Sequence, residues 1–207
     1  MRDFSGSALV GQVAWEREFA SSGFTVAAGV FASNADPDDP AGEILLTENN
    51  TRDYRAFNLE VQYRSRLFGQ PCRLGFDWSH NARDYGGAPP GSFSAFHAGD
   101  IDGYAAEVLW GTNEKSGDWL LGYYYSHQEA LAAHSSYIQD DWVRWGNANQ
   151  VRATNLKGSE MRVMYTIRPN MNIFARVFFV HAIDFLEPGD ATKETGNRFR
   201  IEYNVSF

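Results

Sequence analysis

The last ten residues of the chain alternate between polar and apolar side chains without interruption. Successive side chains of a β-strand point to opposite faces, so residues 198–207 predict a strand with two chemically different faces. One face carries Phe199, Ile201, Tyr203, Val205 and Phe207, and the other carries Arg198, Arg200, Glu202, Asn204 and Ser206. The chain therefore ends on a strand that separates an apolar surface from a polar one.

Eight further segments show the same period-two pattern at strand length. They are residues 9–19, 24–32, 53–67, 72–82, 103–112, 119–130, 161–167 and 173–179. Short turns and long connections alternate between them. The long connections, rich in Gly, Pro, Asp and Asn, are residues 34–52, 85–102, 131–157 and 185–196. Short turns on one side of a membrane and long loops on the other are typical of outer-membrane barrels.

These patterns predict an all-β fold, an antiparallel up-and-down transmembrane β-barrel with about nine visible strands in a single domain, residues 1–207. No apolar run approaches the roughly 18 residues that a membrane helix needs. Single-chain barrels generally have an even number of strands, and the start at Met1 shows no signal peptide. These observations favour the C-terminal part of a larger barrel, truncated at the N-terminus, over a mature chain that was given a new Met and whose strands are miscounted. In either case the expected location is the bacterial outer membrane.

Charge and cysteine content exclude several classes of function. The net charge of -8 argues against nucleic-acid binding, which needs clustered Lys and Arg. The single cysteine, Cys72, excludes an internal disulfide framework and a multi-cysteine zinc site. We interpret it as a small apolar strand residue. No motif for a cofactor or a metal is present, so neither is expected.

The polar strand faces carry charges of both signs, which we predict to line a pore and to tune its ion preference. The predicted pore-lining residues are Glu60, Arg64, Arg73, Asp77, Glu107, Arg162, Arg176, Arg198, Arg200 and Glu202. A solvated strand face of no special function is the alternative. The longest connection is a candidate constriction loop, in which Asp140, Asp141, Arg144 and Arg152 would face each other across the pore, although its tryptophans could equally pack at the rim.

Three smaller features of the sequence bear on function. An acidic stretch, Asp36, Asp38, Asp39 and Glu43, is interpreted as a solvated external loop and not as a cation site. Aromatic residues near strand ends predict interfacial girdles; they are Trp15, Trp78, Trp110, Trp119, Tyr123, Tyr165, Tyr203 and Phe207. Adjacent serine–histidine pairs at 79–80, 126–127 and 134–135 point to opposite faces of a strand, so an enzyme is not expected unless strand pairing brings Ser79 near His127.

Two stretches resemble a porin family of Gram-negative bacteria. The first is Gly117–Leu131 (GDWLLGYYYSHQEAL), followed by the acidic loop Gln139–Trp142 and by Asn155–Gly158. The second is Tyr165–Phe174 (YTIRPNMNIF), where a strand turns at a proline and returns. The resemblance covers residues 54–207, and the N-terminal half of the family's barrel has no counterpart in this chain.

The resemblance implies a barrel of about sixteen strands that passes small hydrophilic solutes or ions by passive diffusion. It implies outer-membrane lipid as the surroundings. The last strand, through Tyr203, Val205 and Phe207, would be the signal read by the barrel-assembly machinery. A homotrimer is left open. The alternative is a soluble β-barrel that binds a small apolar ligand, with its apolar face inside and its polar face outside.

Overall fold

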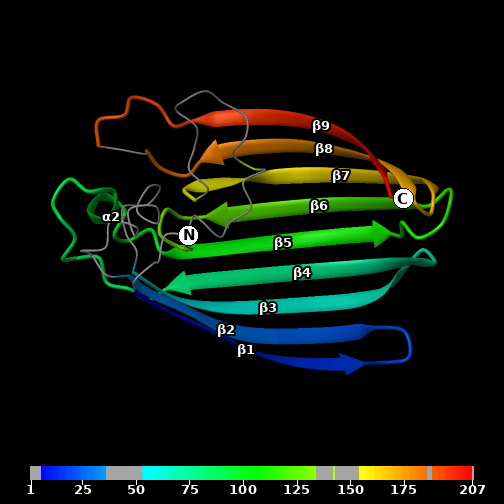
Figure 1. The fold of residues 1–207 in the computed structure, drawn as a ribbon, viewed down its shortest axis with the longest axis horizontal. Coiled ribbons are helices and arrows are strands. Elements are labelled where there is room, and N and C mark those ends of the chain that lie inside the picture. Colours follow the sequence, from blue (N-terminus) through cyan, green and yellow to red (C-terminus); the bar gives the residue numbers. More distant parts are fainter. Residues whose placement is uncertain (1–5, 36–52, 134–141, 143–153, 186–187, 207) are drawn as a thin grey trace.

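The computed structural model describes residues 6–35, 53–133, 142, 154–185 and 188–206, which form one antiparallel sheet of nine strands. Each strand pairs with its neighbours in chain order, so the sheet is an up-and-down meander (Figure 1). The strands are β1 (Gly6–Glu18), β2 (Gly23–Ala35), β3 (Tyr54–Leu67), β4 (Gln70–Asn81), β5 (Asp102–Gly111), β6 (Trp119–Gln128), β7 (Leu156–Arg168), β8 (Met171–Ala182) and β9 (Thr195–Val205). The prediction of an all-β, antiparallel, up-and-down fold is confirmed.

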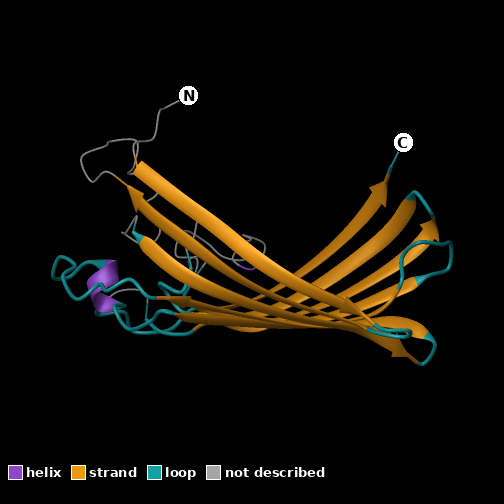
Figure 2. Ribbon diagram, turned by 90° about the horizontal axis from the view of Figure 1, so that it is seen from below, coloured by secondary structure: helices purple, strands orange, loops and turns teal. Residues whose placement is uncertain are grey.

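The sheet is curved but not closed. Figure 2 shows the strands bent into a trough, with a concave face and a convex face. Its two edges are β1 and β9, which pair only with β2 and β8 in the described part of the chain. These nine strands alone therefore do not make the barrel that the sequence pattern predicts.

All nine predicted segments are strands, but several of their bounds were wrong. β1 begins before the predicted 9–19 and ends at Glu18, and β2 extends beyond the predicted 24–32 at both ends, because their hydrogen-bonded register runs from Gly6 opposite Ala35 to Glu18 opposite Gly23. β6 ends at Gln128 and not at Ala130, which is fully buried in the following connection. β9 ends at Val205, and Phe207 lies outside the described residues.

The turn between β3 and β4 is shorter than predicted. Phe68 and Gly69 both have positive φ angles, 53° and 78°. Two consecutive residues with positive φ reverse an antiparallel pair directly, as in a type I′ turn. Gln70 and Pro71 therefore belong to β4, where Pro71 lies opposite Arg66, and not to the predicted turn 68–71.

The short and long connections lie at opposite ends of the sheet (Figure 1). The strands leave short connections at 19–22, 68–69, 112–118 and 169–170, and long ones at 36–53, 82–101, 129–155 and 183–194. The connection 82–101 contains a one-turn helix that the sequence did not predict, α2 (Phe93–Phe96), capped by the Ser92 side chain, which accepts a hydrogen bond from the Ala95 amide. No helix in the described ranges is both long and apolar enough to cross a bilayer.

A small core at the long-loop end ties these connections to the sheet. The Asn81 side chain is fully buried at the end of β4, and its amide donates to the Tyr85 hydroxyl at 2.9 Å and to the Leu131 carbonyl at 2.7 Å. Tyr85 and Leu131 belong to one buried hydrophobic cluster with Phe93 and Ala130. Because a buried amide without partners is costly, these bonds fix the connections 82–101 and 129–155 against each other.

Candidate functional site: a charged concave face

The convex face of the sheet is apolar and exposed. One register row across it carries Tyr63, Leu74, Val108, Tyr123, Met161, Val177 and Phe199. Leu74, Val108 and Met161 are 44%, 43% and 51% exposed. Folded soluble domains rarely expose so large a contiguous apolar surface, which marks a site of contact with lipid or protein.

The polar side chains predicted to line a pore all occupy the opposite, concave face. The pairing registers place them in alternation with the apolar rows on β3, β4, β5, β7, β8 and β9. The ten residues are Glu60, Arg64, Arg73, Asp77, Glu107, Arg162, Arg176, Arg198, Arg200 and Glu202. The sheet therefore brings charged side chains from six of its strands onto one surface.

Five of these residues form a single row of arginines across the sheet. Arg64 lies opposite Arg73, and Arg162, Arg176 and Arg200 are opposite one another on β7, β8 and β9. The two groups are joined in the same row by Leu109 and Gly122. Like charges directly opposite each other destabilise a sheet, so this row needs compensating carboxylates.

Carboxylates of neighbouring positions supply part of the compensation. The Arg73 Nε atom lies 2.7 Å from the Glu107 Oε1 atom, and a second nitrogen donates to Oε2 at 3.2 Å. Arg64 donates to Glu18 at 2.5 Å. Arg73 is thus held by one hydrogen bond and one close charge contact, because its Nε atom has no hydrogen-bond partner in the described part of the chain.

The most deeply buried charge of the concave face, Glu160, was missed by the sequence analysis. Its side chain has no exposed surface. Its carboxylate accepts hydrogen bonds from Arg162 at 2.5 and 2.9 Å, from Arg176 at 2.6 Å and from the indole of Trp142 at 3.1 Å. The signal was present in the sequence, because Glu160 is two residues before Arg162 and must share its face of the strand.

Aromatic rings lie against the guanidinium groups. The Arg162 guanidinium carbon is 3.8 Å from the centre of the Tyr124 ring. The corresponding carbon of Arg176 is 4.8 Å from the centre of the Phe178 ring, and that of Arg198 is 5.7 Å from the same ring. Stacking on an aromatic face stabilises a guanidinium group and restricts its movement.

Glycines make room for the long side chains that lie along the concave face. A Cβ atom on Gly75 would be 2.6 Å from a carbon of Glu107, the residue that reaches Arg73. A Cβ atom on Gly122 would lie 2.9 Å from Leu109 and 3.1 Å from the Tyr124 ring. These glycines are needed for space, which explains their presence inside strands where glycine is otherwise unfavourable.

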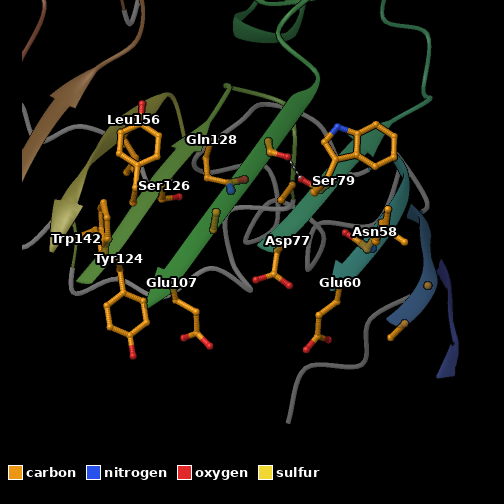
Figure 3. Close-up of a pocket in the computed structure, with 18 of the residues that line it drawn as sticks. Asn58, Glu60, Asp77, Ser79, Glu107, Tyr124, Ser126, Gln128, Trp142 and Leu156 are labelled. Atoms are coloured by element: carbon orange, nitrogen blue, oxygen red, sulfur yellow. Dashed lines mark hydrogen bonds between the residues drawn. The ribbon is translucent and has the colours of Figure 1, made fainter. Parts of the chain in front are cut away.

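The concave face contains a hollow of about 670 Å³. Figure 3 shows Glu60, Asp77, Glu107 and Tyr124 pointing in one direction from neighbouring strands. These four residues line the hollow together with Arg73 and Arg162. Glu60 and Asp77 are directly opposed on β3 and β4. Within the described part of the chain neither of these two carboxylates has a cationic partner, so the hollow exposes uncompensated negative charge.

Two described residues of the long connection between β6 and β7, Ala133 and Trp142, line the hollow of this face. Trp142 is 9% exposed, donates to Glu160, and packs edge-on against Phe178 with the ring centres 6.3 Å apart. A tryptophan of this connection therefore packs on the concave face. The four residues predicted to form a constriction, Asp140, Asp141, Arg144 and Arg152, lie outside the described residues, as does the acidic stretch with Asp36, Asp38, Asp39 and Glu43.

The aromatic residues of the convex face form two rows near the strand ends. Trp119, Tyr165 and Tyr203 lie in one row with Ile173 near the short turns, and Trp78 and Tyr104 lie in another near the long connections. The prediction for Tyr123 was wrong, because this residue lies in the middle of β6. Tyr203 of the predicted assembly signal is 59% exposed on the edge strand.

The serine and histidine pairs do not assemble a catalytic group among the described residues. Ser79 is in register with Gly103 and Gln128, whereas His127 is in register with Tyr104 on the other face, so the two side chains are separated by the sheet. His127 stacks on Tyr104 with the ring centres 5.0 Å apart. His80 is 2.9 Å from Asp102, and the pair at 134–135 lies outside the described ranges.

No described group of three or more His, Cys, Asp or Glu side chains is arranged to hold a metal ion. Cys72 is a buried residue of β4, as interpreted from the sequence. No protein-family model, curated protein or solved structure matches the chain, so its function is inferred from the sheet and its two faces.

Proposed function

We propose that the chain forms part of the wall of an outer-membrane β-barrel that passes small hydrophilic solutes or ions by passive diffusion. The observation that carries the proposal is the division of the sheet into an exposed apolar convex face and a charged concave face. In a transmembrane barrel the outer surface meets hydrocarbon and the inner surface meets water. A soluble barrel requires the reverse arrangement, so the two faces favour the membrane protein.

The height of the apolar surface supports the same proposal. On β6, Trp119 lies in the aromatic row near the short turns. His127, which stacks on Tyr104, lies in the row near the long connections. Eight residue steps of strand span about 26 Å, or about 20 Å along the membrane normal at a usual tilt. This height is close to the apolar band of outer-membrane barrels, about 25 Å. Aromatic side chains at both borders are the expected interfacial girdles.

The open edges constrain how the barrel closes. β1 and β9 run in the same direction, because eight antiparallel pairings separate them. A fully antiparallel closure therefore requires an odd number of additional strands between these edges. A barrel of about sixteen strands, which the family resemblance implies, would add about seven to the nine described, an odd number.

The distribution of charge suggests how solutes are selected. On β3–β5 this face carries as many arginines as carboxylates: Arg64, Arg66 and Arg73 against Glu60, Asp77 and Glu107. On β7–β9 the arginines outnumber the carboxylates: Arg162, Arg176, Arg198 and Arg200 against Glu160 and Glu202. The positive excess on β7–β9 would produce a transverse field that orients dipolar solutes and would influence the preference between cations and anions. In this arrangement the short turns face the periplasm and the long connections face the exterior.

Conductance across a lipid bilayer tests the proposal. The full-length barrel that contains this chain, with the additional strands that closure requires, is refolded into vesicles, which are fused with a planar bilayer bathed in potassium chloride. We expect discrete conductance steps, and we expect replacement of Arg198 and Arg200 by Glu to shift the reversal potential toward cations. If the vesicles contain folded, protease-resistant protein but show no conductance, the result would be compatible with a barrel but would overturn the channel function. A chain that folds in water without lipid or detergent would support the soluble barrel instead.

A further inference from the structure

Glu160 occupies a position that a carboxylate rarely tolerates. It has no exposed surface, and an ionised group removed from water must be paired and hydrogen-bonded. Four donor nitrogens meet this need: two from Arg162, one from Arg176 and the indole nitrogen of Trp142. The carboxylate is thus the common acceptor for groups from β7, from β8 and from the connection between β6 and β7.

The two arginines need this carboxylate in return. Arg162 and Arg176 lie directly opposite each other on β7 and β8, where their charges repel. The Glu160 Oε1 atom accepts a hydrogen bond from the Nε atom of each arginine, at 2.5 Å and 2.6 Å. One oxygen atom therefore joins two guanidinium groups that would otherwise repel each other.

The aromatic neighbours define where the held groups lie. Tyr124 and Phe178 are the residues in register with Glu160 on β6 and β8. The Arg162 guanidinium lies against the Tyr124 ring and that of Arg176 against the Phe178 ring. The carboxylate and the rings contact each guanidinium from two directions. The two arginine side chains therefore lie close to the concave face of the sheet, and Arg176 is only 5% exposed.

We propose that Glu160 is a positioning residue that sets the ion selectivity of this concave face through Arg162 and Arg176. The buried carboxylate fixes how far the two positive charges extend toward the water-filled side and neutralises one of them. The effect on selectivity rests on the proposed channel function, whereas the effect on the position of the arginines does not. Glu160 itself does not touch a passing solute.

A charge-conserving variant separates position from charge. Glu160→Asp keeps the negative charge but shortens the side chain by one methylene, about 1.5 Å, so the carboxylate cannot bond both Nε atoms at their present places. The matched control is Glu202→Asp, which shortens a carboxylate of the same face that pairs with Arg200 at 2.6 Å. If only the number of charges mattered, both variants would behave like the unaltered chain.

The first measurement reports on the arginines without any channel activity. The refolded chain is treated with phenylglyoxal, which modifies accessible guanidinium groups, and the rate at each arginine is determined by mass spectrometry. We expect Glu160→Asp to raise the rates at Arg162 and Arg176 severalfold and to leave Arg64 unchanged, which also shows that the variant is folded. We expect Glu202→Asp to leave Arg162 and Arg176 protected. Equal protection in the Glu160→Asp variant would overturn the positioning role.

The second measurement is the reversal potential across a potassium chloride gradient. We expect Glu160→Asp to shift it toward anions, and we expect the shift to vanish when Arg162 and Arg176 are both replaced by Gln. A shift of the same size in that background would mean that Glu160 acts independently of the arginines and would overturn the proposal. Absence of conductance in the unaltered full-length barrel would overturn the proposed channel and the selectivity effect, while the modification rates would still decide the positioning role.

Discussion

Glu60 and Asp77 lie directly opposite each other on β3 and β4, and both line the hollow of the concave face. Among the described residues, Arg73 pairs with Glu107 and Arg64 pairs with Glu18. Glu60 and Asp77 have no cationic partner in this part of the chain. Directly opposed like charges cost stability in a sheet. The two opposed carboxylates at this point of the concave face are explained if they attract cations that move through the hollow.

Replacing Asp77 by Asn is expected to increase the stability of the sheet and to decrease the selectivity of the proposed channel for cations. Removing the repulsion with Glu60 should stabilise the sheet by about 0.2–1 kcal/mol. The permeability ratio of potassium to chloride should fall, because one uncompensated negative charge is lost. Urea titration and the reversal potential measure the two effects. Glu114→Gln, in the connection 112–118, is the control and should alter neither; a permeability ratio that stays constant in Asp77→Asn would remove this carboxylate from the ion path.

Val108 and Leu109 are adjacent in β5 and point to the convex and the concave face. Val108→Arg should destabilise the chain in lipid vesicles by about 2–4 kcal/mol, because in the proposed membrane barrel a charge near the middle of the convex face must leave water. Leu109→Arg should cost no more than about 1 kcal/mol, which is the repulsion expected from the facing Arg73. Urea titration of the refolded proteins gives both values. Equal losses for the two variants would be incompatible with a lipid-facing convex surface.

Gly111, the last residue of β5, and Gly117, within the β5–β6 connection, have similar positive φ angles, 98° and 89°. Gly117→Ala should destabilise the chain by about 1–2 kcal/mol, the usual cost of a left-handed conformation with a Cβ atom. Gly111→Ala should cost more, because its Cβ atom would overlap the carbonyl oxygen of Trp119 at 2.0 Å. Thermal or urea unfolding ranks the two. If Gly117→Ala were the more damaging, the described geometry of this turn would be wrong.

Asp184 follows β8 in the connection to β9. Its pKa is lowered because the Phe185 amide donates to the carboxylate at 2.8 Å and because the Lys193 ammonium lies 3.3 Å away. A lowered pKa in the folded state means that the group contributes stability above its ordinary pKa of 3.8, and that this contribution is lost as the pH falls through the lowered value.

Lys193→Ala should raise the pKa of Asp184 only part of the way to its ordinary value, because the Phe185 amide remains. An NMR titration of the Asp184 side-chain carboxyl measures this change. Lys115→Ala, at the opposite end of the sheet, is the control and should leave the titration of Asp184 unaltered. An Asp184 pKa that did not respond to Lys193→Ala would contradict the ion pair.

The sequence alone determined the strands and the chemistry of their faces. The period-two alternation on either side of Phe199 or Leu74 is a local property, because successive side chains of any strand point to opposite faces. The positions of the short and long connections were also predictable from their turn residues. For the same reason the ten charged residues of the polar face followed from the alternation alone, and Glu160 could have been added from its spacing to Arg162.

The tertiary structure decided which of these residues meet. The row of arginines through Arg73 and Arg162 depends on the register of every pair of strands from β3 to β9, and a slip by one residue in any pair would exchange its faces. The contact of Trp142 with Glu160 joins residues from a connection and a strand whose relative placement no local pattern specifies. The open edges at β1 and β9 likewise follow from pairing across the whole sheet. Alternation is set by neighbouring residues, whereas register, burial and closure are set by contacts between segments far apart in the chain.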